Sequence, residues 1–292
     1  VLALLLLRNV VMSWPGFVEA AQPLAVSGIL LAAALTRRNG TSMVALGYIS
    51  VFLVFLLLRP VADETSVPVG YAYPILFDRV LFLGGLPMVW LQDLFYVPGR
   101  VGALDLALSG VYVTYFLAPH LVALIVWRTR PRLFPKATVA LALCFLLGLG
   151  FYFAVPTAPP WLASDRGDID AEVVRILPEV SAQLAGDTYD EASSAVGKND
   201  VAAMPSLHTA LTAMVAMIAA QYGRIWRRVG MAYVAAMALS LVYLGEHYVI
   251  DEVAGVAMAL GVWRLVSTHR AFAWVRPATR EDDGQAEVRR AA

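Results

Sequence analysis

The chain has 292 residues, of which 60% are hydrophobic and only 15% are charged. Soluble domains average about 45–50% apolar and about 25% charged residues, so this composition excludes an ordinary soluble domain and indicates a multi-pass membrane protein. Lysine and arginine together balance aspartate and glutamate at 22 residues each, and the resulting net charge of zero argues against a nucleic-acid partner.

Apolar stretches close to the length that crosses a bilayer, about 20 residues, recur along the chain. The predicted spanning helices lie at 18–36, 43–58, 104–127, 137–155, 206–222, 229–246 and 248–267. We therefore expect an all-α, polytopic membrane helix bundle. Its core would hold six helices, from the one at 43–58 onward, and the helix at 18–36 would be an extra N-terminal helix.

The same pattern divides the chain into three parts. Residues 1–42 are read as an N-terminal interfacial or transmembrane extension, in which Arg8 interrupts the first apolar stretch. Residues 43–268 are read as the membrane-embedded core. Residues 269–292 are polar and charged, so we expect them to form a disordered cytoplasmic tail.

The loops between these helices differ in length and in charge. The short loops are basic and contain Arg37, Arg38, Arg128, Arg130, Arg132, Lys136, Arg224, Arg227 and Arg228. They alternate with long loops at 59–103 and 156–205, of which the second is acidic. Basic short loops favour the cytoplasmic side of a plasma membrane, which places both long loops outside. The aromatic first loop predicts short interfacial helices, and 162–200 is expected to form a helical cap over a site.

His247 and Asp251 lie at the outer end of the last predicted helix and are the first candidate site residues. Residues i and i+4 share one face of a helix, so Asp251 can accept a hydrogen bond from one ring nitrogen of His247. That bond would fix the tautomer and leave the other nitrogen free as a nucleophile or base. The alternative is a purely structural bond between the two side chains.

His208 follows Pro205 and Ser206, a combination that is typical of a helix start. A helix N-terminus presents free amide hydrogens to an anion such as phosphate, although a histidine there can also be a simple capping residue. One helical hairpin separates His208 from His247, so both are expected at the same outer depth. A His–His–Asp set of this kind suits phosphoryl transfer through a phosphohistidine, with His208 as the general acid.

A bound phosphate also needs positive charge and hydrogen-bond donors. The candidates are Lys198, Arg79 and Arg59 as cations and Asn199, Ser206 and Ser240 as donors. Each cation has a structural alternative. Lys198 would be a solvated loop residue, Arg79 would contact Asp78, and Arg59 would extend to the membrane interface. The sequence holds no Asp/Glu cluster with the spacing of a magnesium site. We therefore expect no metal and no cofactor.

Other polar residues have simpler explanations. Glu246 is next to His247, but neighbours on a helix point about 100° apart, so we expect a structural role for it. His120 falls in the middle of a span, where a polar side chain is costly, and it is a weaker candidate for a second site. Cys144 lies in an apolar run and is read as a small core residue.

The motifs around the two histidines resemble those of the type 2 phosphatidic acid phosphatase superfamily, which contains membrane lipid phosphatases and phosphotransferases. The family's Pro-Ser-Gly-His motif reads Pro205-Ser206-Leu207-His208 here. Its second motif is Ser-Arg, five residues, His, three residues, Asp. In this chain it runs from Ser240-Leu241 to His247 and Asp251, with leucine in place of arginine.

The family's earlier motif, Lys, six residues, Arg-Pro, is absent. Phe52 stands at the lysine position before Arg59-Pro60, and Ala123 stands there before Arg130-Pro131. The histidines and the aspartate are thus kept while most phosphate-binding cations are lost. The sequence around the histidines resembles the inositol phosphorylceramide synthase branch more than the simple phosphatases.

The resemblance covers residues 43–268 and implies a lipid phosphatase or phosphotransferase whose active site faces the extracytoplasmic side of the plasma membrane. In that family the histidine at the position of His247 attacks phosphorus, and His208 would protonate the leaving group. The substrate would be a lipid phosphate or a phospholipid, with water or a lipid or sugar hydroxyl as acceptor. A polyprenyl- or phosphatidyl-phosphate phosphatase is an alternative, and so is an inactive lipid-binding or transport protein on the same scaffold.

Overall fold

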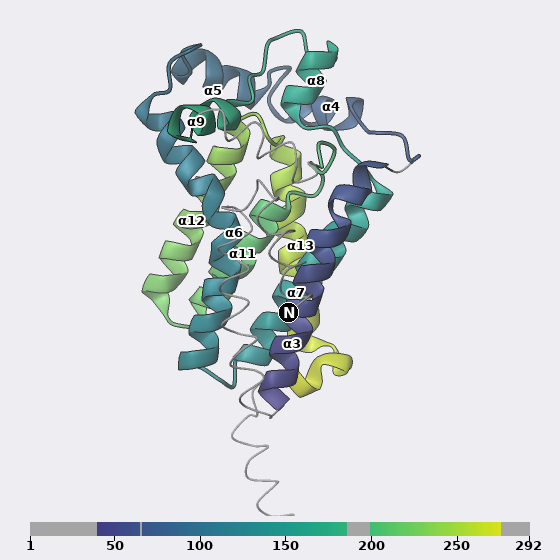
Figure 1. Cartoon of the computed structure of the whole chain (residues 1–292), viewed down its shortest axis with the longest axis vertical. Helices are drawn as coiled ribbons and strands as arrows, with labels where there is room; N and C mark the ends of the chain where they lie inside the picture. The colour runs from purple at the N-terminus through teal and green to yellow at the C-terminus, as the bar shows by residue number, and fades with distance from the viewer. Residues whose placement is uncertain (1–39, 65, 186–198, 276–292) are drawn as a thin grey trace, which may run out of the picture.

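The computed structural model describes residues 40–64, 66–185 and 199–275, and apart from isolated bridges the regular structure in these ranges is helical. Long helices run side by side as a bundle (Figure 1). They are α3 (Gly40–Leu58), α6 (Ala103–Thr129), α7 (Phe134–Ala154), α11 (Leu207–Ala220), α12 (Arg224–Tyr243) and α13 (Val249–Thr268). The all-α prediction is confirmed. The predicted helix at 18–36 and the predicted disordered end of the tail lie outside the described residues.

Four of these helices, α3, α6, α7 and α12, are long and apolar enough to cross a membrane, as expected for a multi-pass membrane protein. The other two differ from the predicted spans. α11 is apolar but has only 14 residues. α13 has 20 residues, but Asp251, Glu252 and Arg264 make it more polar than the sequence pattern suggested. These two helices begin beside the candidate site, with His208 and Asp251 in their first turns.

Short helices from the two long loops lie at the end of the bundle where α12 ends and α13 begins (Figure 1). They are η1 (Pro60–Glu64), α4 (Ala72–Leu81), α5 (Pro87–Phe95), α8 (Pro160–Arg166) and α9 (Ile176–Ala185). The first loop therefore folds into short helices, as its aromatic and proline content predicted. At the opposite end of the bundle, η2 (Arg270–Val275) follows α13. The start of the predicted disordered tail is therefore helical, and Val275 is buried in the bundle core.

The helices α11 and α13 approach each other very closely. A Cβ atom on Gly255 of α13 would collide with the carbonyl oxygen of Ser206 at the start of α11, so only glycine permits this approach. Beside this contact, the buried Thr209 hydroxyl donates a hydrogen bond to the Glu252 carboxylate across the two helices. Small residues and buried polar bonds are typical of helix pairs inside membranes. Together they fix α11 and α13 in one relative position.

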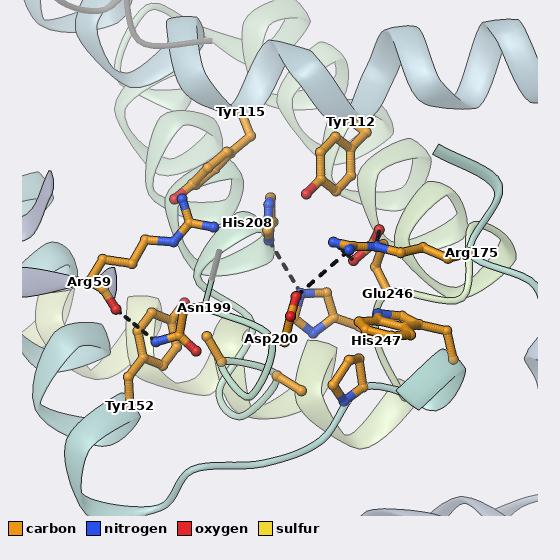
Figure 2. Close-up of a pocket in the computed structure, with 14 residues that line it drawn as sticks. Arg59, Tyr112, Tyr115, Tyr152, Arg175, Asn199, Asp200, His208, Glu246 and His247 are labelled. Carbon is orange, nitrogen blue, oxygen red and sulfur yellow. Dashed lines mark hydrogen bonds and ion pairs between the residues drawn. The ribbon is translucent and has the colours of Figure 1, made fainter. Parts of the chain in front are cut away.

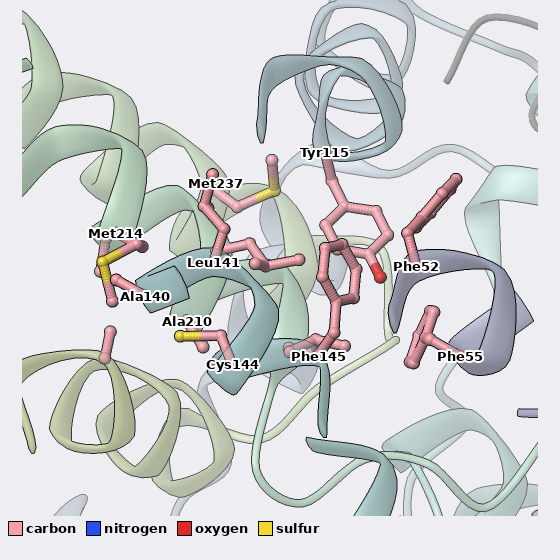
Figure 3. Close-up of a cluster of buried hydrophobic side chains, with 14 of the residues drawn as sticks. Phe52, Phe55, Tyr115, Ala140, Leu141, Cys144, Phe145, Ala210, Met214 and Met237 are labelled. Carbon is pink, nitrogen blue, oxygen red and sulfur yellow. The ribbon is translucent and has the colours of Figure 1, made fainter. Parts of the chain in front are cut away.

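The interior of the bundle is a buried apolar cluster (Figure 3). Its members include Phe52, Phe55, Tyr115, Ala140, Leu141, Cys144, Phe145, Ala210, Met214 and Met237. Cys144 is fully buried there, as expected of a small core residue. His120 of α6 is also buried, with its Nδ1 2.9 Å from the Tyr48 hydroxyl and its ring against Phe52. These contacts explain His120 as a packing residue of the bundle.

Candidate active site

His208 is the second residue of α11, and the start of this helix is held by its own motif. The Ser206 side chain caps α11 by accepting a hydrogen bond from the Thr209 amide at 3.3 Å. The Ser206 amide in turn donates to the backbone carbonyl of Asp251 at 3.0 Å. The imidazole of His208 rests against Tyr112 and Tyr115 of α6, with ring centroids 4.8 and 4.1 Å apart. The ring orientation is thus set by α6 and α11 together.

His247 lies in the turn between α12 and α13, where Gly245 has a φ of 77°, a left-handed conformation that favours glycine. Its Nε2 is 3.2 Å from Nδ1 of His208. Its Nδ1 is 3.4 Å from Oδ2 of Asp251, and the same carboxylate oxygen accepts the Tyr248 amide at 2.9 Å. The structure therefore brings the three residues of the predicted His–His–Asp set together.

The way in which His247 meets Asp251 differs from the expected one. His247 precedes α13, which begins at Val249, so the two residues do not share a face of one helix. Instead, Asp251 in the first turn of α13 reaches back over the helix N-terminus and caps the chain at Tyr248. For the same reason the expected 100° separation of His247 and Glu246 does not apply in this turn.

A second carboxylate holds the same turn from outside the motif. Asp78 of α4 is fully buried and accepts hydrogen bonds from the amides of Val249 at 2.9 Å and Ile250 at 3.1 Å. Burial raises the pKa of Asp78 to about 6, against the lowering effect of these two bonds. The layer of short helices therefore supplies the N-terminal cap of the helix that follows His247. Sequence spacing gave no signal for this contact because α4 and α13 are far apart in the chain.

His208 and His247 open into a pocket at this end of the bundle, and Figure 2 shows the side chains around it. Its lining consists of Arg59, Tyr112, Tyr115, Tyr152, Pro159, Trp161, Arg175, Asn199, Asp200, Ala202, Ala203, His208, Glu246 and His247. The residues come from both long loops, from three of the long helices and from the turn before α13, so no single sequence segment contains the site.

Two of the predicted phosphate-binding residues lie in this pocket. Arg59, just after α3, extends its side chain toward His208 and Tyr115 (Figure 2). Asn199 is also in the wall, but its side chain is engaged with the backbone. Its Nδ2 donates to the carbonyl of Arg59 at 2.9 Å, and its Oδ1 accepts the Val201 amide at 3.1 Å. Asn199 therefore positions the chain around Arg59.

The most prominent polar contact of the pocket was not predicted. Arg175, between α8 and α9, forms a two-pronged ion pair with Glu246, with Nε–Oε1 and NH2–Oε2 distances of 2.8 and 3.3 Å. Its NH1 is 3.7 Å from Oδ1 of Asp200, and its guanidinium lies 4.7 Å from the ring centroid of Trp161. Burial acts to lower the pKa of Arg175, but the charge and hydrogen bonds of Glu246 outweigh it and raise the pKa above its usual value. Glu246 therefore lines the pocket, although it was expected to point about 100° away from His247, and its pairing with Arg175 fits the structural role expected of it.

Three other candidates lie elsewhere. Arg79 forms an exposed ion pair with Asp170, at 3.5 Å, and does not line the pocket. The Ser240 hydroxyl is buried and donates to the carbonyl of Leu108 at 2.7 Å, which ties α12 to α6. Ser206 is used as the cap of α11. Lys198 lies outside the described residues. Among the residues that are described, no cluster of His, Cys, Asp or Glu could hold a metal ion.

A signal for Arg175 does exist in the sequence. The acidic loop at 156–205 contains few cations, namely Arg166, Arg175 and Lys198. Choosing among them requires knowing which part of the loop folds against the turn that carries His247. The contact between residues 174–176 and 243–245 is non-local, so periodicity and spacing do not reveal it.

Comparison with known proteins adds a family assignment to this geometry. A family model described as the PAP2 superfamily matches residues 79–265, well over half of the chain and including His208, His247 and Asp251. A curated relative from Bacteroides thetaiotaomicron, named phosphoinositol dihydroceramide synthase, is 29% identical over 165 residues. The match covers 52% of this chain and 52% of the relative, so the chain spans about half the length of that protein. No solved structure matches significantly.

Proposed function

Because the chain belongs to the PAP2 superfamily, we propose that it is a membrane enzyme that cleaves a phosphoester bond of a lipid through a covalent phosphohistidine on His247. The observation that carries this proposal is the contact of His247 Nε2 with His208 Nδ1, at 3.2 Å, while Asp251 engages the opposite ring nitrogen of His247. A nucleophile, an acid and an orienting carboxylate are thus within reach of one another in a single pocket.

In the first half of the reaction, Nε2 of His247 attacks phosphorus and the bond from phosphorus to the leaving oxygen breaks. His208 gives its proton to that oxygen, so that the lipid leaves as a neutral alcohol. The Asp251 carboxylate stabilises the positive charge that develops on the His247 ring, as a carboxylate does in other His–Asp pairs.

The second half reverses these roles. His208, now neutral, accepts the proton of an acceptor hydroxyl while the acceptor oxygen attacks phosphorus. The bond from phosphorus to Nε2 breaks, which restores His247 and leaves His208 protonated for the next cycle. Water as the acceptor gives hydrolysis, and a lipid hydroxyl gives transfer.

We favour transfer of a phosphorylated head group onto a lipid hydroxyl. The relative's name describes a synthase of a phosphoinositol dihydroceramide, which is the product of such a transfer. The pocket is also lined by the Asp200 carboxylate and by the tyrosines Tyr112 and Tyr115, which are polar groups apart from the two histidines. Such groups suit a head group with hydroxyls.

We also propose that the pocket faces the extracytoplasmic side. The short loops of the bundle carry the basic residues, and these favour the cytoplasm. The layer of short helices that covers the pocket is formed by the two long loops, which alternate with the basic ones.

Phosphohistidine trapping tests the proposal. The purified protein is mixed with phosphatidylinositol labelled in its phosphate, with and without a ceramide acceptor, and quenched in alkali, where phosphohistidine survives. We expect label on the wild-type protein, its loss in the His247→Ala variant, and labelled phosphoinositol ceramide when the acceptor is present. Free labelled inositol phosphate in place of the ceramide product would identify a hydrolase. Turnover that persists in His247→Ala would refute the mechanism.

A further inference from the structure

The pocket has to hold a phosphate without the cations of the family motifs. At the motif's arginine position the chain has Leu241, which is fully buried in the apolar cluster. Of the described residues that line the pocket, Arg59 and Arg175 are the lysines or arginines. Arg59 belongs to the Arg-Pro pair that is retained from one family motif, whereas Arg175 lies in none of the family motifs.

The backbone around Arg175 is fixed against the turn that carries His247. Gln92 of α5 accepts the Val174 amide at 2.9 Å, and its Nε2 donates to the carbonyls of Val174 and Tyr243, both at 2.8 Å. On the other side, the Ile176 amide donates to the carbonyl of Leu244 at 3.3 Å. Both chain neighbours of Arg175 are therefore held in register with the end of α12, three to four residues before His247.

The side chain of Arg175 is fixed as well. Glu246 engages Nε and NH2, and Trp161 lies under the guanidinium plane at 4.7 Å. The Trp161 amide donates to the carbonyl of Gly245 at 3.2 Å, so this aromatic support belongs to the same turn. Figure 2 shows the guanidinium extending toward the two histidines below the Tyr112 ring. Pre-organisation of this kind is what a transition-state charge requires.

Arg175 retains hydrogen-bond donors for a ligand. A guanidinium has five N–H groups, and the pairing with Glu246 occupies one on Nε and one on NH2. The contact of NH1 with Asp200 is longer, at 3.7 Å, and the Asp200 side chain is 42% exposed against 8% for Glu246. Asp200 is therefore the weaker partner of Arg175, and a bound anion can replace Asp200 at NH1.

On this basis, and resting on the proposed function, we propose that Arg175, held by Glu246, is the phosphate-binding cation that takes the place of the motif arginine lost at Leu241. The phosphate of the substrate displaces Asp200 from NH1 and accepts from it, while Glu246 keeps the guanidinium beside His247. The positive charge has thus moved from a long helix of the core to the loop that covers the pocket, and it acts on the same phosphoryl group.

The test uses the full-length purified protein and orthovanadate as a mimic of the transferring phosphoryl group. We expect Arg175→Ala to lower kcat/KM by about 10²–10³-fold, as loss of one charged donor at a reacting centre does, and to raise the inhibition constant of vanadate. Arg175→Lys should restore part of both losses because the charge is retained. Added guanidinium ion should partly rescue Arg175→Ala. Asp200→Asn should lower the vanadate inhibition constant, since it removes a competing anion.

Arg166→Ala is the matched control. Arg166 also pairs with a carboxylate, Asp168 at 3.4 Å, and lies over an aromatic ring, Tyr71 at 4.2 Å, but it does not line the pocket. It should retain wild-type turnover and vanadate inhibition. If Arg175→Ala loses turnover with an unchanged vanadate constant and no rescue by guanidinium, the arginine is only structural and the proposal is wrong. Wild-type kinetics in Arg175→Ala would also overturn it.

The same preparations separate this inference from the proposed function. Phosphohistidine trapping on the wild-type protein reports the function alone. Label on the wild type together with equal, equally fast label on Arg175→Ala would refute the role of Arg175 and leave the phosphohistidine mechanism standing. An unlabelled wild-type protein that still turns over would refute the mechanism itself.

Discussion

Nε2 of His247 lies 3.2 Å from Nδ1 of His208, although 39 positions separate the two residues in the chain. One comes from the turn before α13 and the other from the first turn of α11, so the distance depends on how these two helices pack. A change that moves the start of either helix therefore alters the geometry of the pair.

The first prediction concerns the nucleophile and its carboxylate. His247→Ala should abolish turnover, and Asp251→Asn should lower it by several orders of magnitude because the ring of His247 loses its charged partner. Residues that act as one unit show non-additive losses, so the double variant should be no worse than His247→Ala. Initial rates and thermal unfolding of the three proteins in detergent check this. A double variant that is much slower than His247→Ala would contradict it.

Gly255→Ala should reduce activity by separating α11 from α13. The new Cβ would collide with the Ser206 carbonyl, and backbone at such a contact can yield only by moving the helix that carries His208. We expect a marked fall in kcat with a smaller change in the thermal midpoint. Gly261→Ala is the matched control, since a Cβ at Gly261 of the same helix meets nothing within 4 Å. Equal activities of the two variants would show that the close approach does not set the site.

Asp78→Ala should destabilise the turn that carries His247, because two amides at the start of α13 lose their acceptor. Loss of a helix N-cap costs about 0.5–2 kcal/mol. Denaturant or thermal unfolding in detergent measures this cost, and the initial rate reports the accompanying displacement of His247. Asp93→Ala, on the neighbouring helix α5, serves as the control for removing a carboxylate from the same layer.

The pH dependence of stability should also depend on Asp78. Its pKa in the folded protein is about 6, above the ordinary value of 3.8, so between these values the folded state binds more protons than the unfolded state. The contribution of this group to stability therefore falls as the pH rises from about 4 to about 6. Asp78→Asn should flatten this part of the profile. Thermal midpoints of the wild-type and Asp78→Asn proteins, measured across this pH window, test the prediction. Identical slopes of midpoint against pH would contradict the raised pKa of Asp78.

Topology can be tested by cysteine labelling of intact cells in a Cys144→Ala background. Asp170 is 96% exposed on the covering layer, and Arg227 is exposed near the start of α12 at the other end of the bundle. An impermeant thiol reagent should label Asp170→Cys and should not label Arg227→Cys, because basic short loops stay in the cytoplasm. The reverse pattern would place the pocket on the cytoplasmic side.

The helices of the core could be predicted from the sequence because each is a long apolar run. The predicted span at 104–127 is observed as Ala103–Thr129, and the one at 137–155 as Phe134–Ala154. The motifs also pointed to the two histidines and Asp251, which the structure brings together, although Asp251 meets His247 across the start of α13 and not along one helix face. The end of α11 was not predicted correctly, because the predicted span ran to residue 222 whereas the helix ends at Ala220, with Gln221 as its C-cap.

The candidate phosphate-binding residues were harder to predict because their positions depend on non-local contacts. Ser240 has the residue type of a donor, but it faces α6 and is satisfied by Leu108. Arg79 has the right charge, but α4 turns it toward Asp170. Arg175 and Asp78 reach the site only because loop segments fold over the end of α12, which no sequence period encodes. The role of Lys198 stays a prediction, and Lys198→Ala beside Arg175→Ala would compare the two.

The direct contact between the imidazoles of His208 and His247 has a spectroscopic consequence. In the proposed mechanism, Nε2 of His247 bonds either to phosphorus or to its histidine partner, and never to both at once. The ring-to-ring hydrogen bond is therefore a property of the unloaded enzyme alone. Nitrogen-15 chemical shifts of the two imidazoles would then report, in real time and without any radioactive label, what fraction of the protein carries the covalent intermediate.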